Sequence, residues 1–239
     1  MSRRCAQAMA NWHVFDTRDE MVASLKSAIA EQLFAAIGEG RRASWAVSGG
    51  STPAPLFAAM QNEPLPWDKI DVALVDERWV PFDHPRSNEA FVTANLIGDN
   101  TRAANLIGMK TEAQTPNEAV EEVNLGYSKI RQPFDSILLG LGADGHTASL
   151  FPDAVGLDEA FDPAAEACVA LRAVRSEITG DEVERMSLSA RAIASAPHVT
   201  MMITGAVKKQ VLESALEANS QLPAGRLHKL KPFDVYWAP

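Results

Sequence analysis

The sequence predicts an α/β fold: a mostly parallel sheet with helices on both faces, arranged as a modified Rossmann-like three-layer sandwich. One observation behind this prediction is that short apolar runs alternate with helical segments along the 239 residues, as in parallel strands joined by helices. A second is that glycine-rich or charged segments directly follow four of the predicted strands. Because such sheets bind ligands at the carboxyl ends of their strands, we expect one ligand site there.

The longest predicted helix covers residues 17–37. It starts at a capping box of Thr17 and Glu20, continues with apolar residues at three- and four-residue spacing, and ends at Gly38 and Gly40. Shorter helices are predicted over 87–96, over about 206–218 and, behind a second capping box of Thr115 and Glu118, over 116–131.

Short apolar runs predict five strands, at 45–47, 72–75, 136–139, 167–173 and 198–203. No repeat, low-complexity tract or linker interrupts the pattern, so residues 13–239 are expected to form a single α/β domain. Residues 1–12 are expected to form a flexible N-terminal tail.

Composition and charge exclude several classes of function. The 22 Lys and Arg against 31 Asp and Glu give a net charge of −9, so we expect no broad surface for nucleic acid or membrane, although one pocket can still bind a small phosphate. Two cysteines, Cys5 and Cys168, are too few for a disulfide scaffold and indicate reduced thiols in a cytoplasmic protein. The N-terminus lacks the apolar core of a signal peptide, and no uninterrupted apolar stretch approaches the ~18 residues of a membrane-spanning helix.

The segment Ser48-Gly49-Gly50-Ser51-Thr52-Pro53 follows the first of these strands. Its glycines let backbone N–H groups approach a ligand, Ser51 and Thr52 add hydroxyl donors, and the next helix presents its positive end. Thr52 is expected to cap that helix, with Pro53 at its first position. The segment predicts a phosphate cradle without the spacing of a Walker A loop; a simple tight turn is the alternative.

The segment Gly140-Leu141-Gly142-Ala143-Asp144-Gly145-His146 follows the strand at 136–139. It matches the G-x-G-x-x-G dinucleotide fingerprint, but Pro152 comes too soon after Gly145 for the helix that this fingerprint needs. Asp144 and His146 indicate general-base chemistry instead, because a carboxylate can orient an imidazole and stabilise its protonated form. A capping aspartate beside a solvent-exposed histidine is the alternative.

Two further segments supply cationic candidates. Asp76-Glu77-Arg78 ends an apolar strand, where Arg78 could bind a phosphate or polarise a carbonyl oxygen. Lys208 lies in the first turn of a predicted helix, where a cation opposes the helix dipole unless an anion is nearby. A surface ion-pair cluster and a solvated lysine are the respective alternatives. The remaining histidines show no metal-ligand spacing.

Together the segments SGGSTP, DERWVP, SNEAFVTANL, GLGADGHTASLFP and ITGAVKK resemble the 6-phosphogluconolactonases of the glucosamine-6-phosphate isomerase/6-phosphogluconolactonase family. The resemblance spans about residues 17–218. Glucosamine-6-phosphate deaminases share the glycine loops and the Asp-Gly-His core, but typically carry a glutamate where this sequence has Phe151, which cannot transfer a proton. Arg78 keeps the Asp-Glu-Arg typical of the lactonases. Residues 176–184, which lack the usual prolines, and the short C-terminal KPFDVYWAP depart from the family pattern.

The resemblance implies an enzyme that hydrolyses 6-phospho-D-glucono-1,5-lactone to 6-phosphogluconate in the oxidative pentose phosphate pathway, with no cofactor and no metal. The expected partner is this sugar phosphate lactone, bound by a monomer or weak homodimer. A catalytically silent sugar-phosphate sensor is the alternative from another class, although a pure phosphate binder needs neither Asp144 nor His146.

The resemblance also implies a role for each site residue. His146 is expected to be the general base and Asp144 to orient it. Arg78 is expected either to join the phosphate clamp or to stabilise the oxyanion. The expected phosphate ligands are Gly49, Gly50, Ser51, Thr52 and Lys208.

Overall fold

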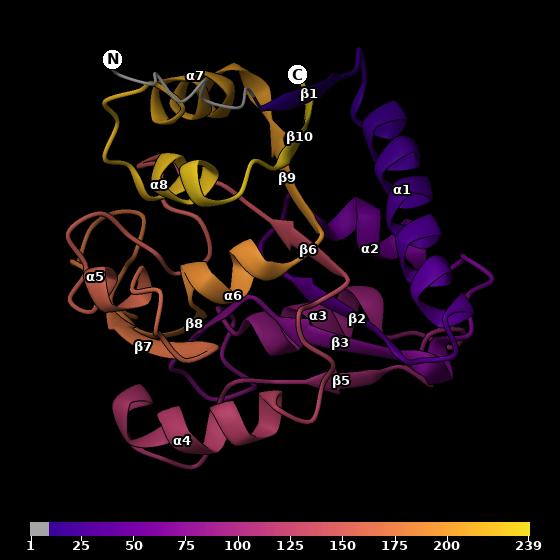
Figure 1. The fold of residues 1–239 in the computed structure, drawn as a ribbon, viewed down its shortest axis with the longest axis horizontal. Coiled ribbons are helices and arrows are strands. Elements are labelled where there is room, and N and C mark those ends of the chain that lie inside the picture. Colours follow the sequence, from indigo (N-terminus) through magenta and orange to yellow (C-terminus); the bar gives the residue numbers. More distant parts are fainter. Residues whose placement is uncertain (1–9) are drawn as a thin grey trace, which may run out of the picture.

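Seven parallel strands build the main sheet of the computed structural model, which describes residues 10–239 (Figure 1). In chain order they are β1 (Asn11–Val14), β2 (Ala43–Val47), β3 (Ile70–Leu74), β5 (Asn105–Ile107), β6 (Ser136–Leu139), β9 (His198–Thr204) and β10 (Asp234–Ala238). Their order across the sheet is β1-β10-β9-β6-β2-β3-β5, and every neighbouring pair is parallel. The predicted α/β class with a mostly parallel sheet is therefore confirmed.

A second, antiparallel sheet lies beside the first. It contains β4 (Asp76–Arg78), β8 (Glu184–Leu188) and β7 (Cys168–Arg172), in the order β4-β8-β7. Only Val75 separates β3 from β4, so the chain passes from the main sheet into the small sheet at the carboxyl end of β3. This crossing places the charged residues of β4 at the ligand-binding edge of the main sheet.

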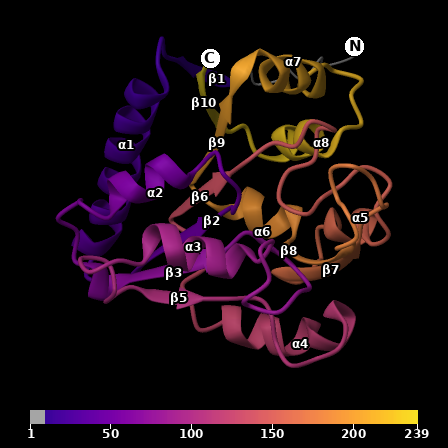
Figure 2. The same cartoon turned by 180° about the vertical axis from the view of Figure 1, so that it is seen from behind.

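Helices cover both faces of the main sheet. Figures 1 and 2 show α1 and α2 on one side and α7 and α8 on the other. The helices are α1 (Arg18–Gly38), α2 (Ala54–Met60), α3 (Asn88–Leu96), α4 (Pro116–Tyr127), α5 (Leu157–Ala160), α6 (Ala190–Ser195), α7 (Gly205–Ala215) and α8 (Pro223–Leu230), with a 3₁₀ turn at Trp67–Lys69. The central strands β2, β3 and β6 are buried along their whole length, as expected of a sheet covered on both faces.

Helix α1 begins where the sequence predicts. The Thr17 side chain accepts from the backbone N–H of Glu20, and the Glu20 side chain accepts from that of Thr17, which completes the capping box. Within residues 10–239, α1 is the one helix that could cross a membrane by length and composition. Its inner face, however, is fully buried in the hydrophobic core, at Met21, Leu25, Ile29 and Leu33.

The structure differs from the sequence-based expectations at Thr52 and at the end of the N-terminal tail, and it does not describe Cys5. Thr52 does not cap α2, because the N-cap is Pro53 and no side chain bonds to the first turn. Of the tail expected over residues 1–12, Asn11 and Trp12 form part of β1, paired with β10. Residues 1–9, including Cys5, lie outside the described residues, whereas Cys168 is buried.

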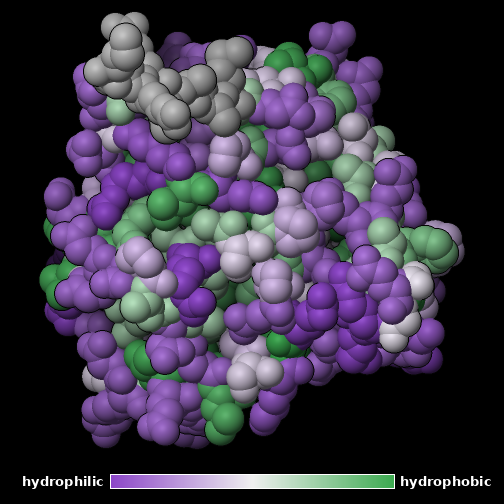
Figure 3. Space-filling view, in the orientation of Figure 1, coloured by the Kyte–Doolittle hydropathy of each residue, from purple (hydrophilic) through white to green (hydrophobic). Residues whose placement is uncertain are grey.

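The surface seen in Figure 3 is predominantly hydrophilic, and its apolar side chains are scattered over several elements. Both described ends of the chain lie in one edge of the main sheet, because C-terminal β10 sits between N-terminal β1 and β9.

Candidate active site

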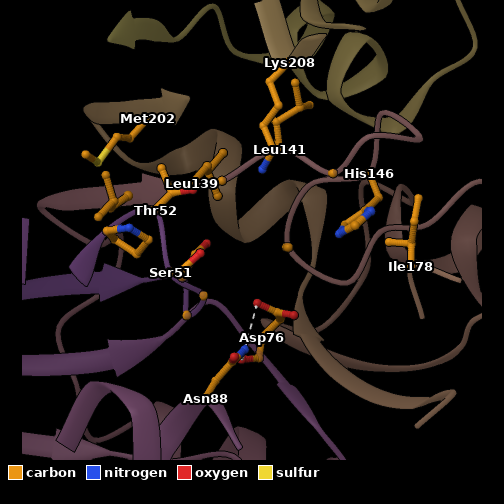
Figure 4. A pocket seen from close by; sticks show the side chains of 18 of the residues that line it. Ser51, Thr52, Asp76, Asn88, Leu139, Leu141, His146, Ile178, Met202 and Lys208 are labelled. Atoms are coloured by element: carbon orange, nitrogen blue, oxygen red, sulfur yellow. Dashed lines mark hydrogen bonds between the residues drawn. The ribbon is translucent and has the colours of Figure 1, made fainter. Parts of the chain in front are cut away.

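A pocket of about 330 Å³ lies at the carboxyl edge of the main sheet (Figure 4). The loops after β2 and β6, strand β4 and the first turn of α7 enclose it. These are the strand ends at which the sequence predicts a ligand site. Among the eight predicted site residues, seven line the pocket: Gly49, Gly50, Ser51, Thr52, Arg78, His146 and Lys208.

Asp144, the eighth predicted residue, bonds to His146. Its Oδ1 lies 2.5 Å from Nδ1 of the imidazole and also accepts from the backbone N–H of His146. Burial alone would raise the pKa of Asp144, but the hydrogen bond and charge of His146 outweigh it and lower that pKa below its ordinary value. With Nδ1 engaged, Nε2 is the ring nitrogen left to face a ligand, and Figure 4 shows the ring turned into the pocket.

The glycines between β6 and His146 make room for this pair. A Cβ on Gly142 would overlap Nδ1 of His146 and lie 2.6 Å from Oδ1 of Asp144. Gly145 adopts a φ of +81°, a left-handed conformation that favours glycine. The next helix is the short α5, which starts only at Leu157. These glycines therefore make room for an ionisable pair and do not open a long helix.

Phe151 closes one side of the imidazole. The two rings stack with centroids 3.9 Å apart and planes at 29°. The guanidinium of Arg185 also lies over the Phe151 ring, 5.3 Å from its centroid. This apolar wall limits the orientations that His146 can adopt.

The loop after β2 forms another wall. Gly50 adopts a φ of +93°, and Gly49 lies so close to α3 that a Cβ there would overlap the side chain of Asn88. Figure 4 shows Ser51 and Thr52 beside the cavity. The loop can thus present backbone N–H groups and two hydroxyls to a ligand, which suits a phosphate.

Cationic side chains approach the pocket from two elements. Lys208 projects from α7, and burial lowers its pKa. Arg78 donates through Nη1 to the backbone oxygen of Arg86, 2.5 Å away, and its Nε is buried with no partner in the described part of the chain. Both groups can hold an anion.

Arg185 is a residue that the sequence analysis did not select. Strand pairing aligns it directly with Arg78. It is 1% exposed, and burial first and the charge of Arg78 second lower its pKa to about 10. The sequence gives little signal for its burial, because only Met186 and Leu188 of the five residues of β8 are apolar. The positive charge of Arg78 in the pocket wall, with Arg185 paired to it on the neighbouring strand, favours an anionic ligand.

The acidic residues of β4 are not a surface cluster. Asp76 and Glu77 are 7% and 0% exposed. Glu77 accepts hydrogen bonds from the backbone N–H groups of Arg78, Asn88 and Glu89, and burial raises its pKa to about 7. Glu77 therefore anchors the start of α3, whereas Asp76 and Asn88 line the pocket. Neither Asp76 nor Asn88 was among the site residues predicted from the sequence. Among residues 10–239, no three His, Cys, Asp or Glu side chains lie close enough to hold a metal ion.

Comparison with known proteins gives related sequences and structures. Residues 16–237 match the family described as glucosamine-6-phosphate isomerases/6-phosphogluconolactonase. A 6-phosphogluconolactonase of Mesorhizobium japonicum is 36% identical over 234 residues, covering 97% of this chain and 97% of its own. The crystal structure of a 6-phosphogluconolactonase from Shewanella baltica matches with a TM-score of 0.90 at 31% identity, covering 98% of this chain and 99% of that chain. A monomeric glucosamine-6-phosphate deaminase shares the fold alone, with a TM-score of 0.75 at 16% identity, over 95% of this chain and 96% of that chain.

Proposed function

The chain belongs to the family of glucosamine-6-phosphate isomerases and 6-phosphogluconolactonases, and from this premise we propose that it hydrolyses 6-phospho-D-glucono-1,5-lactone to 6-phospho-D-gluconate in the oxidative pentose phosphate pathway. The observation that carries the proposal is the Asp144–His146 pair at the wall of a pocket with cationic side chains. Deamination of an aminosugar phosphate, the other activity in the family, uses a glutamate where Phe151 stands. Phe151 packs on His146 and has no proton to transfer.

His146 acts as general base in this proposal. Its Nε2 takes a proton from a water molecule, whose oxygen attacks the lactone carbonyl carbon and forms a tetrahedral oxyanion. The bond from that carbon to the ring oxygen then breaks, and Nε2 returns the proton to the departing alkoxide. Asp144 fixes the ring orientation and stabilises the imidazolium that forms between the two proton transfers.

The phosphate is assigned to Lys208 and the loop formed by Gly49, Gly50, Ser51 and Thr52. Backbone N–H groups and hydroxyls of this loop, with the lysine ammonium, supply the donors that a phosphate dianion requires. Arg78 either completes this clamp or stabilises the oxyanion. The first role affects mainly KM and the second mainly kcat, so steady-state kinetics of Arg78→Met separates them.

The experiment that tests the function is hydrolysis of freshly generated 6-phosphogluconolactone, measured against the spontaneous rate. Wild type should accelerate the reaction, and His146→Ala should lower kcat about 10²- to 10⁴-fold with a much smaller change in KM. His198→Ala is the matched control, because His198 is exposed at the start of β9 and does not line the pocket.

A kcat of His146→Ala close to that of wild type would remove His146 as the base. No acceleration by folded wild type would remove the lactonase proposal. In that case, binding of 6-phosphogluconate would support the sugar-phosphate sensor instead.

A further inference from the structure

Asp76 places a carboxylate in a pocket that otherwise presents cations and neutral donors. The residue is 7% exposed and lines the cavity. Figure 4 shows its carboxylate turned into the open space, across the pocket from Lys208. Neither the general-base mechanism nor the phosphate clamp uses this group.

The hydrogen bonds of Asp76 leave one oxygen available. Oδ2 accepts from the Ser149 hydroxyl at 2.6 Å. The Asn88 amide donates to the backbone oxygen of Asp76 at 2.8 Å and reaches Oδ1 only weakly, at 3.4 Å. A carboxylate can accept about four hydrogen bonds, so Oδ1 retains room for a donor from a ligand.

The charge on Asp76 restricts what that donor can be. A phosphate oxygen would be repelled, whereas a hydroxyl can donate to a carboxylate in a charge-assisted hydrogen bond. The buried guanidinium of Arg185 is near enough to interact electrostatically with Asp76. We therefore propose that Asp76 accepts a hydrogen bond from a hydroxyl of the sugar moiety and makes the pocket select polyhydroxylated phosphates over ligands that carry only a phosphate.

The surroundings hold Asp76 in a fixed orientation for this role. Ser149 is fully buried, and its backbone N–H donates to the Ser187 hydroxyl. Asn88 is packed against Gly49 of the proposed phosphate loop. A hydroxyl-binding carboxylate is thus tied to the phosphate loop through one intervening side chain, and the two subsites keep a fixed separation.

The inference rests on the proposed function for the identity of the sugar, and two ligands test it separately. Binding of 6-phosphogluconate and of inorganic phosphate is measured calorimetrically for wild type, Asp76→Asn and Asp76→Ala. Asp76→Ala should weaken 6-phosphogluconate about 10- to 100-fold, as expected for a hydrogen bond to a charged group. Phosphate affinity should stay the same or rise, because a nearby negative charge is gone. Asp76→Asn should lose less, since an amide oxygen can still accept.

Asp99→Asn is the matched control for loss of one negative charge, because Asp99 is exposed and does not line the pocket. Unchanged 6-phosphogluconate affinity in both Asp76 variants would overturn the inference. Equal weakening of both ligands in the isosteric Asp76→Asn variant would overturn it as well. If wild type neither binds 6-phosphogluconate nor accelerates lactone hydrolysis, the proposed function fails first, which is a distinct result.

Discussion

At the scale of single residues, two glycines make room for side chains of the proposed site, because a Cβ at either position would overlap a neighbour. Gly142 leaves the space in which the Asp144–His146 pair forms, and Gly49 leaves the space for Asn88. The sequence places both glycines in loops after strands, but it does not show which side chains pack on them. Their contacts indicate that each is required by the side chain packed on it and not by backbone conformation alone.

Gly142→Ala should therefore impair catalysis more than folding. The added methyl overlaps the imidazole of His146, so the ring must move away from Asp144. We expect kcat to fall at least about 10-fold, since general-base catalysis by a positioned side chain contributes about 10²- to 10⁴-fold. Steady-state kinetics and thermal unfolding of the same preparations measure the two effects.

Gly126→Ala is the matched control for this substitution. Gly126 lies within helix α4 and has no atom near the position of an added Cβ, so alanine should leave kcat unchanged and stabilise the helix slightly. Wild-type kcat in Gly142→Ala would show that the pair tolerates displacement and would contradict the prediction.

The sequence predicted site residues that follow the ends of strands. It did not predict a residue that is brought to the site by pairing between distant strands. His146 and Lys208 lie where the strand-end rule predicts. Arg185 reaches the pocket region because β4 pairs antiparallel with β8, which aligns Arg185 with Arg78. That register depends on contacts more than 100 residues apart in sequence, and no local pattern encodes it.

At the scale of elements, helix starts were easier to predict than helix ends or short strands. Both predicted capping boxes form, at Thr17 and at Thr115. The helix expected to reach residue 131 ends at Tyr127, however, where the hydroxyl bonds to Leu74 of β3. Edge strands such as β1 and β5 have only four and three residues and form because a neighbouring strand is already in place.

The hydrogen bonds that Glu77 accepts between β4 and the start of α3 should stabilise the folded state measurably. Glu77→Ala removes the acceptor of three backbone N–H groups. Each unsatisfied buried donor costs about 1–3 kcal/mol, and the lower end applies because two of these bonds are only partly buried. We expect the free energy of unfolding to fall by about 3 kcal/mol at pH 5, measured by urea denaturation. Exposed Glu121 on α4 offers the control, and Glu121→Ala should change stability by less than about 0.5 kcal/mol.

The pH dependence of this cost follows from the raised pKa. Burial raises the pKa of Glu77 from its ordinary value of 4.5 to about 7, so the folded state holds the proton more tightly than the unfolded state. The contribution of Glu77 to stability is therefore complete below about pH 4.5 and declines as the pH rises toward 7. The cost of Glu77→Ala should be smaller at pH 8 than at pH 5. A cost that grows with pH would mean that the backbone donors, and not burial, dominate the titration.

At the scale of the whole molecule, net charge and local charge act differently. A chain with net charge −9 still gathers Lys208 and Arg78 at one pocket, with Arg185 paired to Arg78 on the neighbouring strand. The total charge predicts no broad surface for polyanions, but only the fold determines where the cations meet. The same fold joins the two ends of the described chain, since β10 inserts between β1 and β9.

This arrangement predicts that the chain cannot complete its fold before the last residues are in place. A chain that stops at residue 233 lacks β10, so β1 loses its only strand partner among the described elements and β9 becomes an edge. It also lacks Trp237, whose indole N–H donates to Gly205 at the start of α7, the helix that carries Lys208. We expect the truncated chain to lose cooperative urea unfolding and lactone hydrolysis together. Full-length Trp237→Ala keeps β10 but removes the indole contacts with Gly205 and Lys209. It should fold but raise KM a few-fold, because the first turn of α7 is less firmly held. Cooperative unfolding of the truncated chain at the full-length midpoint would refute this dependence on β10.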